Sequence, residues 1–329
     1  MARKMGLRVR IAGTGSVRPG PPVTTSEIVA QVPGTWDAAH VQARTGIAAR
    51  HFVAPGTTAA ALGAEALEKA LDAARMPAAA LTRVIFVDSL GGDGLIPATA
   101  NDVLGALGIS GSCDCFDLNN ACLGFLSAFD VAARGVATGQ SAVAIVVSEL
   151  GSRFITPDDP RPYFVFGDAA AAVIVTASED GAGILGSVLR NDAGNAGGVR
   201  LAHPAHTGAR ETIRFTKPNA HMLDLALDLL RDSTTAVLAQ ADLRLDDVDW
   251  ILPHQPNGIM LEAFVRALGI DSNRVVPVVH ETGSVGSASI PMSLDRLMVS
   301  GRVRGGDHVL MIGVGAGLSS GATLLKMAG

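Results

Sequence analysis

Cys122 is the residue of this sequence best placed to act as a nucleophile, and it stands in the segment FDLNNACLGFLSAFDVAARG. A strand predicted at Cys115–Leu118 leads through the polar pair Asn119-Asn120 into an apolar helix, whose first turn carries Cys122. The unpaired N–H groups and the dipole of a helix start favour a thiolate, which is the reactive form in nucleophilic catalysis. The alternative is a small buried packing residue, which is what most free cysteines are.

His254 is the second candidate, in the segment WILPHQPNGIM. It follows a predicted buried strand and precedes a helix, for which Asn257 is the expected N-cap. A histidine at a strand end can act as a general base or stabilise an oxyanion. A hydrogen-bonded turn histidine is the alternative, and these residues alone leave both open.

Two segments of small residues can bring backbone close to a ligand. The first, GSVGSASIP at residues 283–291, contains Ser284 and enters a helix. Its alternative role is a close helix–helix crossing. The second, GVGAG at residues 313–317, follows a predicted strand and either offers backbone N–H groups to an oxyanion or forms a hairpin turn.

Other motifs do not support a site. Gly13-Thr14-Gly15 lacks the third glycine of a dinucleotide fingerprint, and the prolines between residues 19 and 22 prevent the helix that must follow. Cys113 and Cys115 alternate in a strand and are expected to pack, and no metal-binding motif is found. Asp158-Asp159 is expected to form a turn.

These residues need a layered α/β fold to position them. Short Val- and Ile-rich runs predict strands covered on both faces, and the Ala- and Leu-rich segments between them predict helices. The predicted strands are Leu7–Ala12, Val84–Asp88, Ala142–Ser148, Ala170–Thr176, Trp250–Pro253 and Val309–Gly313. The predicted helices are Thr58–Ala74, Cys122–Thr138, Ala220–Ala239 and Gly258–Leu268.

An internal repeat suggests how the elements are organised. Residues 82–109 and 246–270 each give a strand, a loop and a helix that ends in ALGI. We therefore predict a duplication, with residues 1–178 carrying Cys122 and residues 179–329 carrying His254 and Ser284. Counting from each ALGI places Cys122 opposite Gly283, and the loops of both halves are expected to meet at one cleft.

Composition narrows the class of protein. Of the 329 residues, 48% are hydrophobic and 17% charged, which predicts a large core. A net charge of −5 and only 4% aromatic residues argue against a nucleic-acid-binding protein. Three cysteines fit a reducing compartment, and no apolar run suits a signal peptide or a membrane span. We expect a cytoplasmic protein that does not bind membranes.

Seven segments, in order and spacing, resemble the β-ketoacyl-ACP synthase III family of the thiolase superfamily. They are IAGTGSVRP, ARTGIAARH, DLNNACLGF, VFGDAAAAVIV, PHQPN, GSVGSASIP and GVGAGLSSGATLL, and they cover nearly the whole chain. The resemblance implies an α/β, thiolase-like fold with duplicated halves in a five-layer α-β-α-β-α sandwich. It also implies a homodimer.

The resemblance also implies roles for single residues. Cys122 matches the family cysteine that takes an acyl group from CoA or a carrier protein, and His254 matches the histidine that stabilises the enolate of a malonyl extender. The backbone N–H groups of Cys122 and Ala316 match the oxyanion hole. The implied substrates are acyl-CoA or acyl-phosphopantetheine, with acyl carrier protein as partner and no permanently bound cofactor. The expected substrate- and pantetheine-binding residues are Arg44, Arg161, Asn257 and Ile96.

The chain departs from the family where a catalytic asparagine is usual, because Ser284 stands there. A hydroxyl offers one donor where an amide offers two. Loss of one oxyanion donor costs on the order of 10²–10³ in rate, so the substitution puts malonyl decarboxylation in question.

Two further departures concern the donor. His40 stands where the family has a tryptophan over the CoA adenine, four residues before Arg44, which favours a carrier-protein donor. Ile259 replaces an arginine that often follows the histidine motif. The basic residues that remain as candidates to contact the acidic helix of an acyl carrier protein are Arg44, Arg161 and Arg266.

The leading functional hypothesis is a specialised condensing enzyme of secondary metabolism that forms a C–C bond by Claisen condensation through acyl-Cys122. The alternative is an acyltransferase that passes the acyl group to an alcohol or amine, because that reaction needs no decarboxylation. A third hypothesis is a reduced-activity subunit of a heterodimeric synthase.

Overall fold

The computed structural model describes residues 6–209 and 211–329. A five-stranded sheet is built from strands that all end before residue 178. In it β4 runs parallel to β5 and β6, whereas β7 is antiparallel to its two neighbours. In spatial order its strands are β1 (Val9–Val17), β7 (Asp168–Ala177), β6 (Ala142–Leu150), β4 (Arg83–Val87) and β5 (Asp114–Leu118).

A four-stranded sheet is built from strands after residue 182. Its parallel pair is β11–β12, and its other pairs are antiparallel. A parallel bridge from Ile251 to Val275 takes the place of a fifth strand, so the order and directions of the first sheet recur, as in a duplicated unit. In spatial order its strands are β8 (Gly183–Asn191), β13 (Ser319–Lys326), β12 (His308–Gly315) and β11 (Trp250–Pro253).

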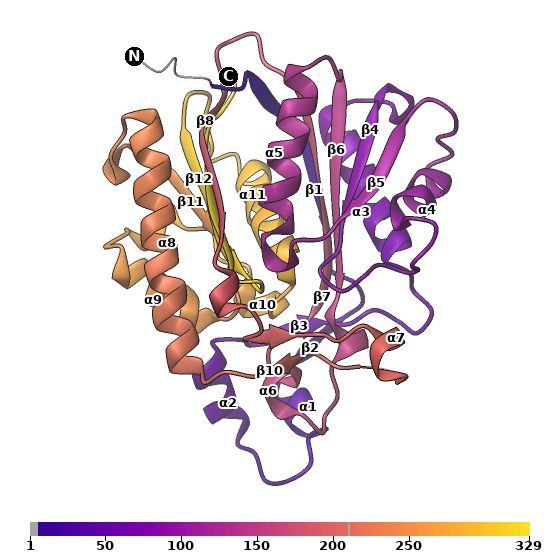
Figure 1. Cartoon of the computed structure of the whole chain (residues 1–329), viewed down its shortest axis with the longest axis vertical. Helices are drawn as coiled ribbons and strands as arrows, with labels where there is room; N and C mark the ends of the chain where they lie inside the picture. The colour runs from indigo at the N-terminus through magenta and orange to yellow at the C-terminus, as the bar shows by residue number, and fades with distance from the viewer. Residues whose placement is uncertain (1–5, 210) are drawn as a thin grey trace.

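Helices complete the five expected layers (Figure 1). One pair covers the outer face of each sheet, and a third pair lies between the sheets. Three apolar clusters fill the spaces between these layers. The outer pairs are α3 (Ala59–Ala74) with α4 (Thr99–Ala106), and α8 (Asn219–Ala241) with α9 (Gly258–Ala267); the central pair is α5 (Gly124–Ala137) with α11 (Ser289–Val299).

Shorter elements gather mainly at one end of the layers, around a fourth, smaller apolar cluster (Figure 1). They are β2 (Pro22–Thr24), β3 (Ala49–His51), β9 (Val199–Arg200), β10 (Arg214–Phe215), α1 (Thr25–Val29), α2 (Ala38–Thr45), α6 (Pro160–Tyr163), α7 (Pro204–Thr207) and α10 (Val279–Thr282). The 3-10 turns of the chain are η1 (Ala78–Ala80), η2 (Ala121–Leu123), η3 (Gly151–Phe154), η4 (Ala193–Asn195), η5 (Leu245–Asp247), η6 (Ser272–Arg274) and η7 (Gly286–Ala288).

The first strand differs from its prediction. It starts two residues later than expected and runs on to Val17, so that Gly13 and Gly15 lie inside the strand. Helix α3 packs directly on it, and a Cβ would lie 2.2 Å from the Ala70 carbonyl oxygen at Gly13 and 2.5 Å from that of Ala66 at Gly15. These glycines therefore allow a close strand–helix approach and form no phosphate loop.

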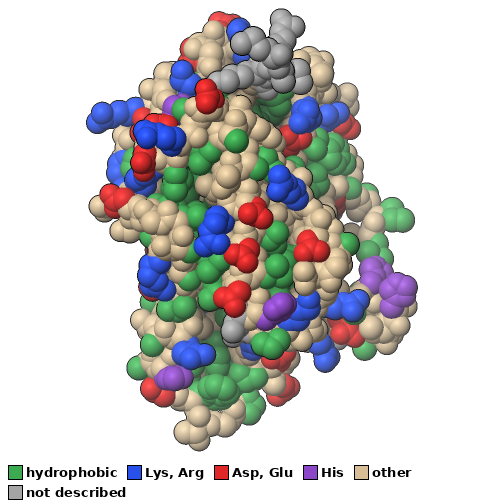
Figure 2. All heavy atoms as spheres, turned by 60° about the vertical axis from the view of Figure 1, so that its left-hand side comes forward, with side chains coloured by type: hydrophobic (Ala, Val, Ile, Leu, Met, Phe, Trp, Pro, Cys, Tyr) green, Lys and Arg blue, Asp and Glu red, His purple; other side chains and the backbone are tan. Residues whose placement is uncertain are grey.

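The outer surface of the second sheet's helices carries charges of both signs. Figure 2 shows basic and acidic side chains interspersed with hydrophobic ones over this face. Across residues 6–209 and 211–329, no helix is both long and apolar enough to span a membrane.

Candidate active site

Cys122 lies in the 3-10 turn η2, between β5 and α5. It does not lie in the first turn of the α-helix, as predicted, because α5 begins only at Gly124. The preceding Ala121 has a φ of +46°, and its N–H donates to the Asn119 side chain at 2.9 Å. The turn after β12 packs closely on η2, since a Cβ at Gly315 would lie 3.2 Å from the backbone nitrogen of Cys122.

The predicted lowering of the Cys122 pKa is wrong. Burial, with a smaller effect of the nearby Glu149 carboxylate, raises the pKa of the Cys122 thiol to about 12. Hydrogen bonds from the backbone N–H groups of Cys122 and Ala316 oppose this rise without cancelling it. Cys122 is therefore a neutral thiol at neutral pH and must lose its proton as it reacts.

His254 follows β11 and is 8% exposed. Its backbone N–H donates to the Ile312 carbonyl at 2.7 Å, and its Nδ1 lies 2.9 Å from the Ser289 hydroxyl oxygen. Burial lowers the pKa of His254 to about 4, against the opposite effect of the Gly286 backbone. A neutral imidazole results at neutral pH, which is able to accept a proton.

Ser284 is 3% exposed and held by its backbone. Its N–H donates to the Val165 carbonyl at 2.8 Å, and its carbonyl accepts from the Gly167 N–H at 3.0 Å. Gly283 before it has a φ of +66°, a conformation that favours glycine. No other residue of the described chain hydrogen-bonds the Ser284 hydroxyl, which leaves this group available to a substrate.

The predicted register between the two halves is shifted by four residues. The equivalent of η2 is η7, because Ala121 and Gly286 begin these turns with φ of +46° and +50°. Cys122 therefore corresponds to Ser287 and not to Gly283. The four-residue helix α10 has no counterpart between β5 and η2, and it accounts for the shift.

The predicted catalytic groups line a single cavity of about 1100 Å³. Cys122, His254, Ser284 and Ala316 all border it. Of the predicted substrate-binding residues, Arg44, Arg161 and Asn257 also line it, as does Ile259. Asn257 is the N-cap of α9, as predicted, since its side chain accepts from the Met260 N–H at 2.8 Å.

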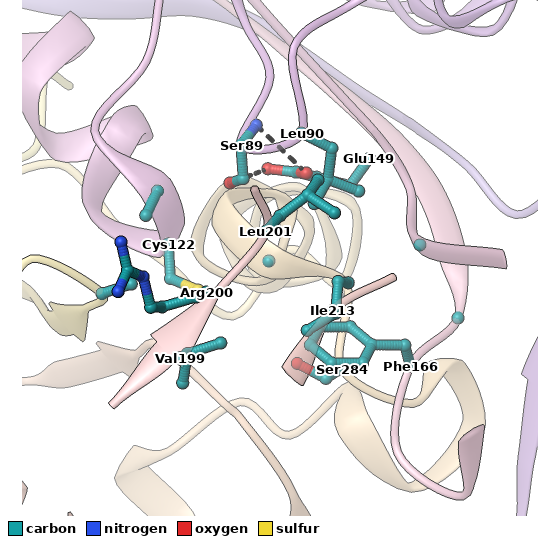
Figure 3. Close-up of a pocket in the computed structure, with 15 residues that line it drawn as sticks. Ser89, Leu90, Cys122, Glu149, Phe166, Val199, Arg200, Leu201, Ile213 and Ser284 are labelled. Carbon is teal, nitrogen blue, oxygen red and sulfur yellow. Dashed lines mark hydrogen bonds between the residues drawn. The ribbon is translucent and has the colours of Figure 1, made fainter. Parts of the chain in front are cut away.

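A second, smaller cavity of about 90 Å³ adjoins Cys122 (Figure 3). Its wall is mainly apolar, with Leu90, Phe166, Leu201 and Ile213 among its residues. Its polar residues are Ser89, Arg200, Ser284 and Glu149, the last a buried carboxyl group at the end of β6. Sequence reasoning missed Glu149, although an acidic residue that ends an otherwise apolar strand is a signal that can be searched for.

Comparison with known proteins identifies the family. The family model 3-Oxoacyl-[acyl-carrier-protein (ACP)] synthase III matches residues 116–193. The model of the C-terminal part of the same family matches residues 238–327, so the two together match about half of the chain. This chain belongs to the 3-oxoacyl-ACP synthase III family.

Solved structures of synthase III family members agree over nearly the full length. The enzyme named 3-oxoacyl-[acyl-carrier-protein] synthase III from Aquifex aeolicus VF5 is 27% identical, with a TM-score of 0.89 over 97% of this chain and 99% of that one. The synthase III of Thermus thermophilus is 28% identical, with a TM-score of 0.88 over 97% and 99%. OleA of Xanthomonas campestris is 25% identical, with a TM-score of 0.88 over 98% and 100%. The predicted thiolase-like fold is thereby confirmed, and the protein is an enzyme of the condensing, acyl-transferring type.

The mouth of the large cavity in this synthase III-family enzyme is more aromatic than predicted. Trp36 lines it from the segment just before α2, with its ring 5.0 Å from that of Phe164 in an edge-on contact. Across the mouth, the Arg161 guanidinium lies 4.4 Å from the centroid of the Phe215 ring. His40 and Arg44 line the cavity from α2, so the predicted replacement of the family tryptophan by His40 stands beside a second aromatic ring, that of Trp36.

Ile96 lines neither the large nor the small cavity, so its substrate-binding role stays a prediction. It is 91% exposed, at the tip of the loop that follows β4. Gly91 and Gly92, with φ of +106° and +70°, turn this loop outward, and Leu90 lines the small cavity instead. Arg266 lies away from both cavities, with Glu262 3.5 Å from its guanidinium.

Proposed function

We propose that this synthase III-family enzyme accepts an acyl group on Cys122 and forms a C–C bond by Claisen condensation, as a specialised member of the family. One observation carries the proposal. Cys122, His254 and the backbone of Ala316 border the same cavity, whose mouth carries two arginines and a tryptophan.

In the acylation step, the Cys122 sulfur attacks the carbonyl carbon of an acyl thioester while His254 takes the thiol proton. The thiol pKa of about 12 and the imidazole pKa of about 4 disfavour a preformed ion pair, so proton transfer accompanies attack. The backbone N–H groups of Cys122 and Ala316 donate to the oxyanion. The CoA or pantetheine thiolate then leaves and takes the proton from His254.

In the condensation step, a malonyl thioester loses CO2 and forms an enolate. His254 and the Ser284 hydroxyl each donate a hydrogen bond to the enolate oxygen. This requires the tautomer of His254 that carries its proton on the ring nitrogen facing the substrate. The enolate carbon attacks the acyl carbonyl carbon, and the Cys122 thiolate leaves. Cys122 then regains a proton, and a β-ketoacyl thioester is released.

Ser284 favours a second candidate, transfer of the acyl group to an alcohol or amine. Its single hydroxyl replaces an amide, whereas His254 remains a neutral base suited to deprotonating such an acceptor. The shared cavity of Cys122 and His254 supports either enzyme over a reduced-activity subunit of a heterodimer.

Two donors fit the mouth of the cavity. Arg44 and Arg161 supply positive charge for phosphate groups, and Trp36 supplies a ring on which an adenine can stack. Acyl-CoA is therefore as well supported as an acyl carrier protein. We further propose a homodimer and no permanently bound cofactor.

Intact-protein mass spectrometry with acyl-CoA and acyl-carrier donors tests the proposal. A mass gain of one acyl group is expected, lost in Cys122→Ser and kept in the matched control Cys115→Ser. Malonyl-carrier protein should then release CO2 and a β-ketoacyl product. A product formed only with an alcohol or amine would favour the second candidate, and no adduct from any donor would reject both.

A further inference from the structure

Glu149 joins two segments that meet near Cys122, one containing Ser89 and the other Ser287. It is 2% exposed, and its Oε1 accepts from the Ser89 hydroxyl at 2.6 Å and from the Ser287 N–H at 3.1 Å. The Ser287 hydroxyl also donates to Oε1, and Oε2 accepts from the Ser89 N–H at 3.3 Å. Figure 3 shows the contact between Ser89 and Glu149 beside Cys122. One carboxyl group thus joins the first sheet to the turn η7 of the second half.

The same turn holds His254. A Cβ at Gly286 would lie 2.8 Å from the Glu149 carboxyl carbon, so the carboxyl group packs against the turn backbone. The Gly286 carbonyl accepts from the Ser289 hydroxyl at 3.2 Å, and that hydroxyl lies 2.9 Å from His254 Nδ1. A displacement of Glu149 is therefore expected to move His254 as well, through Gly286 and Ser289.

The titratable and charged groups around Glu149 come from four places, one of which is β9, whose exposed Arg200 lines the 90 Å³ cavity. Asp88 lies at the end of β4, where it accepts from the Gly91 N–H at 2.9 Å. Cys122 lines the same 90 Å³ cavity from η2, and His254 lies beyond η7. Burial, and next the Asp88 carboxylate, raise the pKa of Glu149 to about 8, and burial raises that of Asp88 to about 6. Both buried acids therefore keep their protons to higher pH than exposed carboxyl groups do.

We propose that Glu149 is a positioning residue of the active site, which orients His254 through the Gly286–Ser287 turn and, when charged, holds Cys122 in its thiol form. The inference rests on the proposed nucleophile Cys122. It assigns a role to a carboxyl group that takes no part in the proposed acylation or condensation step. It also predicts a dependence of thiol reactivity on pH that a purely structural residue would not produce.

The test is the rate at which iodoacetamide alkylates Cys122 as a function of pH, followed on the Cys122 peptide by mass spectrometry. Glu149→Gln removes the charge and keeps the size. The alkylation profiles of the variant and the natural enzyme should coincide below about pH 7 and separate above about pH 8. Above about pH 8 the variant should react roughly tenfold faster, which corresponds to a Cys122 pKa lower by about one unit.

Asp295→Asn is the matched control, because Asp295 also joins the two halves. It accepts from the Thr14 and Ser16 hydroxyls at 2.8 and 2.6 Å and lines neither cavity. Its alkylation profile should follow that of the natural enzyme. Identical profiles for Glu149→Gln and the natural enzyme, or the same shift in Asp295→Asn, would overturn the proposal.

Two further variants keep the test open if Glu149→Gln fails to fold. Asp88→Asn lets Glu149 ionise at lower pH and should slow alkylation near pH 7.5 by roughly two- to threefold. Ser287→Ala should slow acylation by acyl-CoA about tenfold, and it should move the alkylation profile to higher pH, because the lost hydroxyl no longer lowers the pKa of Glu149. An unchanged alkylation rate in Asp88→Asn together with an unchanged acylation rate in Ser287→Ala would also contradict the proposal.

The role of Glu149 can be separated from the proposed function. If the natural enzyme takes no acyl group but the alkylation profiles of Glu149→Gln and the natural enzyme separate as stated, the proposed function fails and the role of Glu149 stands.

Discussion

At the scale of single residues, Ser284 is the position on which the two proposed reactions differ. It occupies a buried position between two backbone hydrogen bonds and borders both cavities. Its hydroxyl has no hydrogen-bond partner within residues 6–209 and 211–329, so it is free to turn toward a substrate oxygen. A hydroxyl reaches less far than an amide and offers one donor, which weakens stabilisation of an enolate.

Ser284→Asn should therefore raise the rate of malonyl decarboxylation by about 10- to 100-fold. The expected gain comes from a second donor at the enolate oxygen. The measurement is release of labelled CO2 from malonyl-CoA and malonyl-carrier protein, with Ser284→Ala as the matched control that should stay at or below the natural rate. Equal rates in Ser284→Asn and Ser284→Ala would show that this position does not contact the enolate.

At the scale of elements, the contact between β1 and α3 depends on glycines. A Cβ at Gly15 would lie 2.5 Å from the Ala66 carbonyl oxygen and 2.6 Å from Lys69 Cβ. Gly105, in α4, has open space around its position instead. The two glycines thus differ in effect. Gly15 sets the distance between β1 and α3, whereas Gly105 only lowers the helix propensity of α4.

Gly15→Ala should lower the free energy of unfolding by about 1–3 kcal/mol, because α3 must move away from the sheet. Gly105→Ala should raise it by up to about 1 kcal/mol, since alanine loses less backbone entropy in a helix. Urea unfolding followed by circular dichroism measures both. The assigned packing would be wrong if the two variants changed stability in the same direction.

At the scale of the whole molecule, two buried carboxyl groups join the first half to the second. Glu149 contacts Ser287, and Asp295 contacts Thr14 and Ser16. The topology of one sheet repeats in the other, and the proposed catalytic groups come from both halves. Burial of Glu149 at this junction raises its pKa and makes the stability of the molecule depend on pH.

Stability should fall as pH rises from about 6.5 to about 8.5. The folded pKa of Glu149, about 8, lies above its ordinary value of 4.5, so over this range the native state binds more protons than the unfolded chain. His254 acts in the opposite direction, because its folded pKa of about 4 lies below its ordinary value of 6.5, and this smaller rise in stability ends by about pH 7.5. Urea unfolding at both pH values measures the fall.

Glu149→Gln should flatten this pH dependence, whereas Asp295→Asn should retain it. An equally steep fall in Glu149→Gln would mean that another group is responsible for the proton uptake on folding.

The sequence alone determined the layered fold and the approximate positions of the elements predicted from it, and it pointed to Cys122 and His254 as candidates, because hydrophobic period and turn chemistry are local properties. Tertiary structure decided the rest. It placed Glu149 beside Cys122, so that burial and charge raised a thiol pKa that the local sequence predicted to fall. It brought Trp36 to the cavity mouth, turned Ile96 outward and shifted the register of the halves by four residues. Desolvation and loop direction depend on segments far apart in the chain, which no local pattern records.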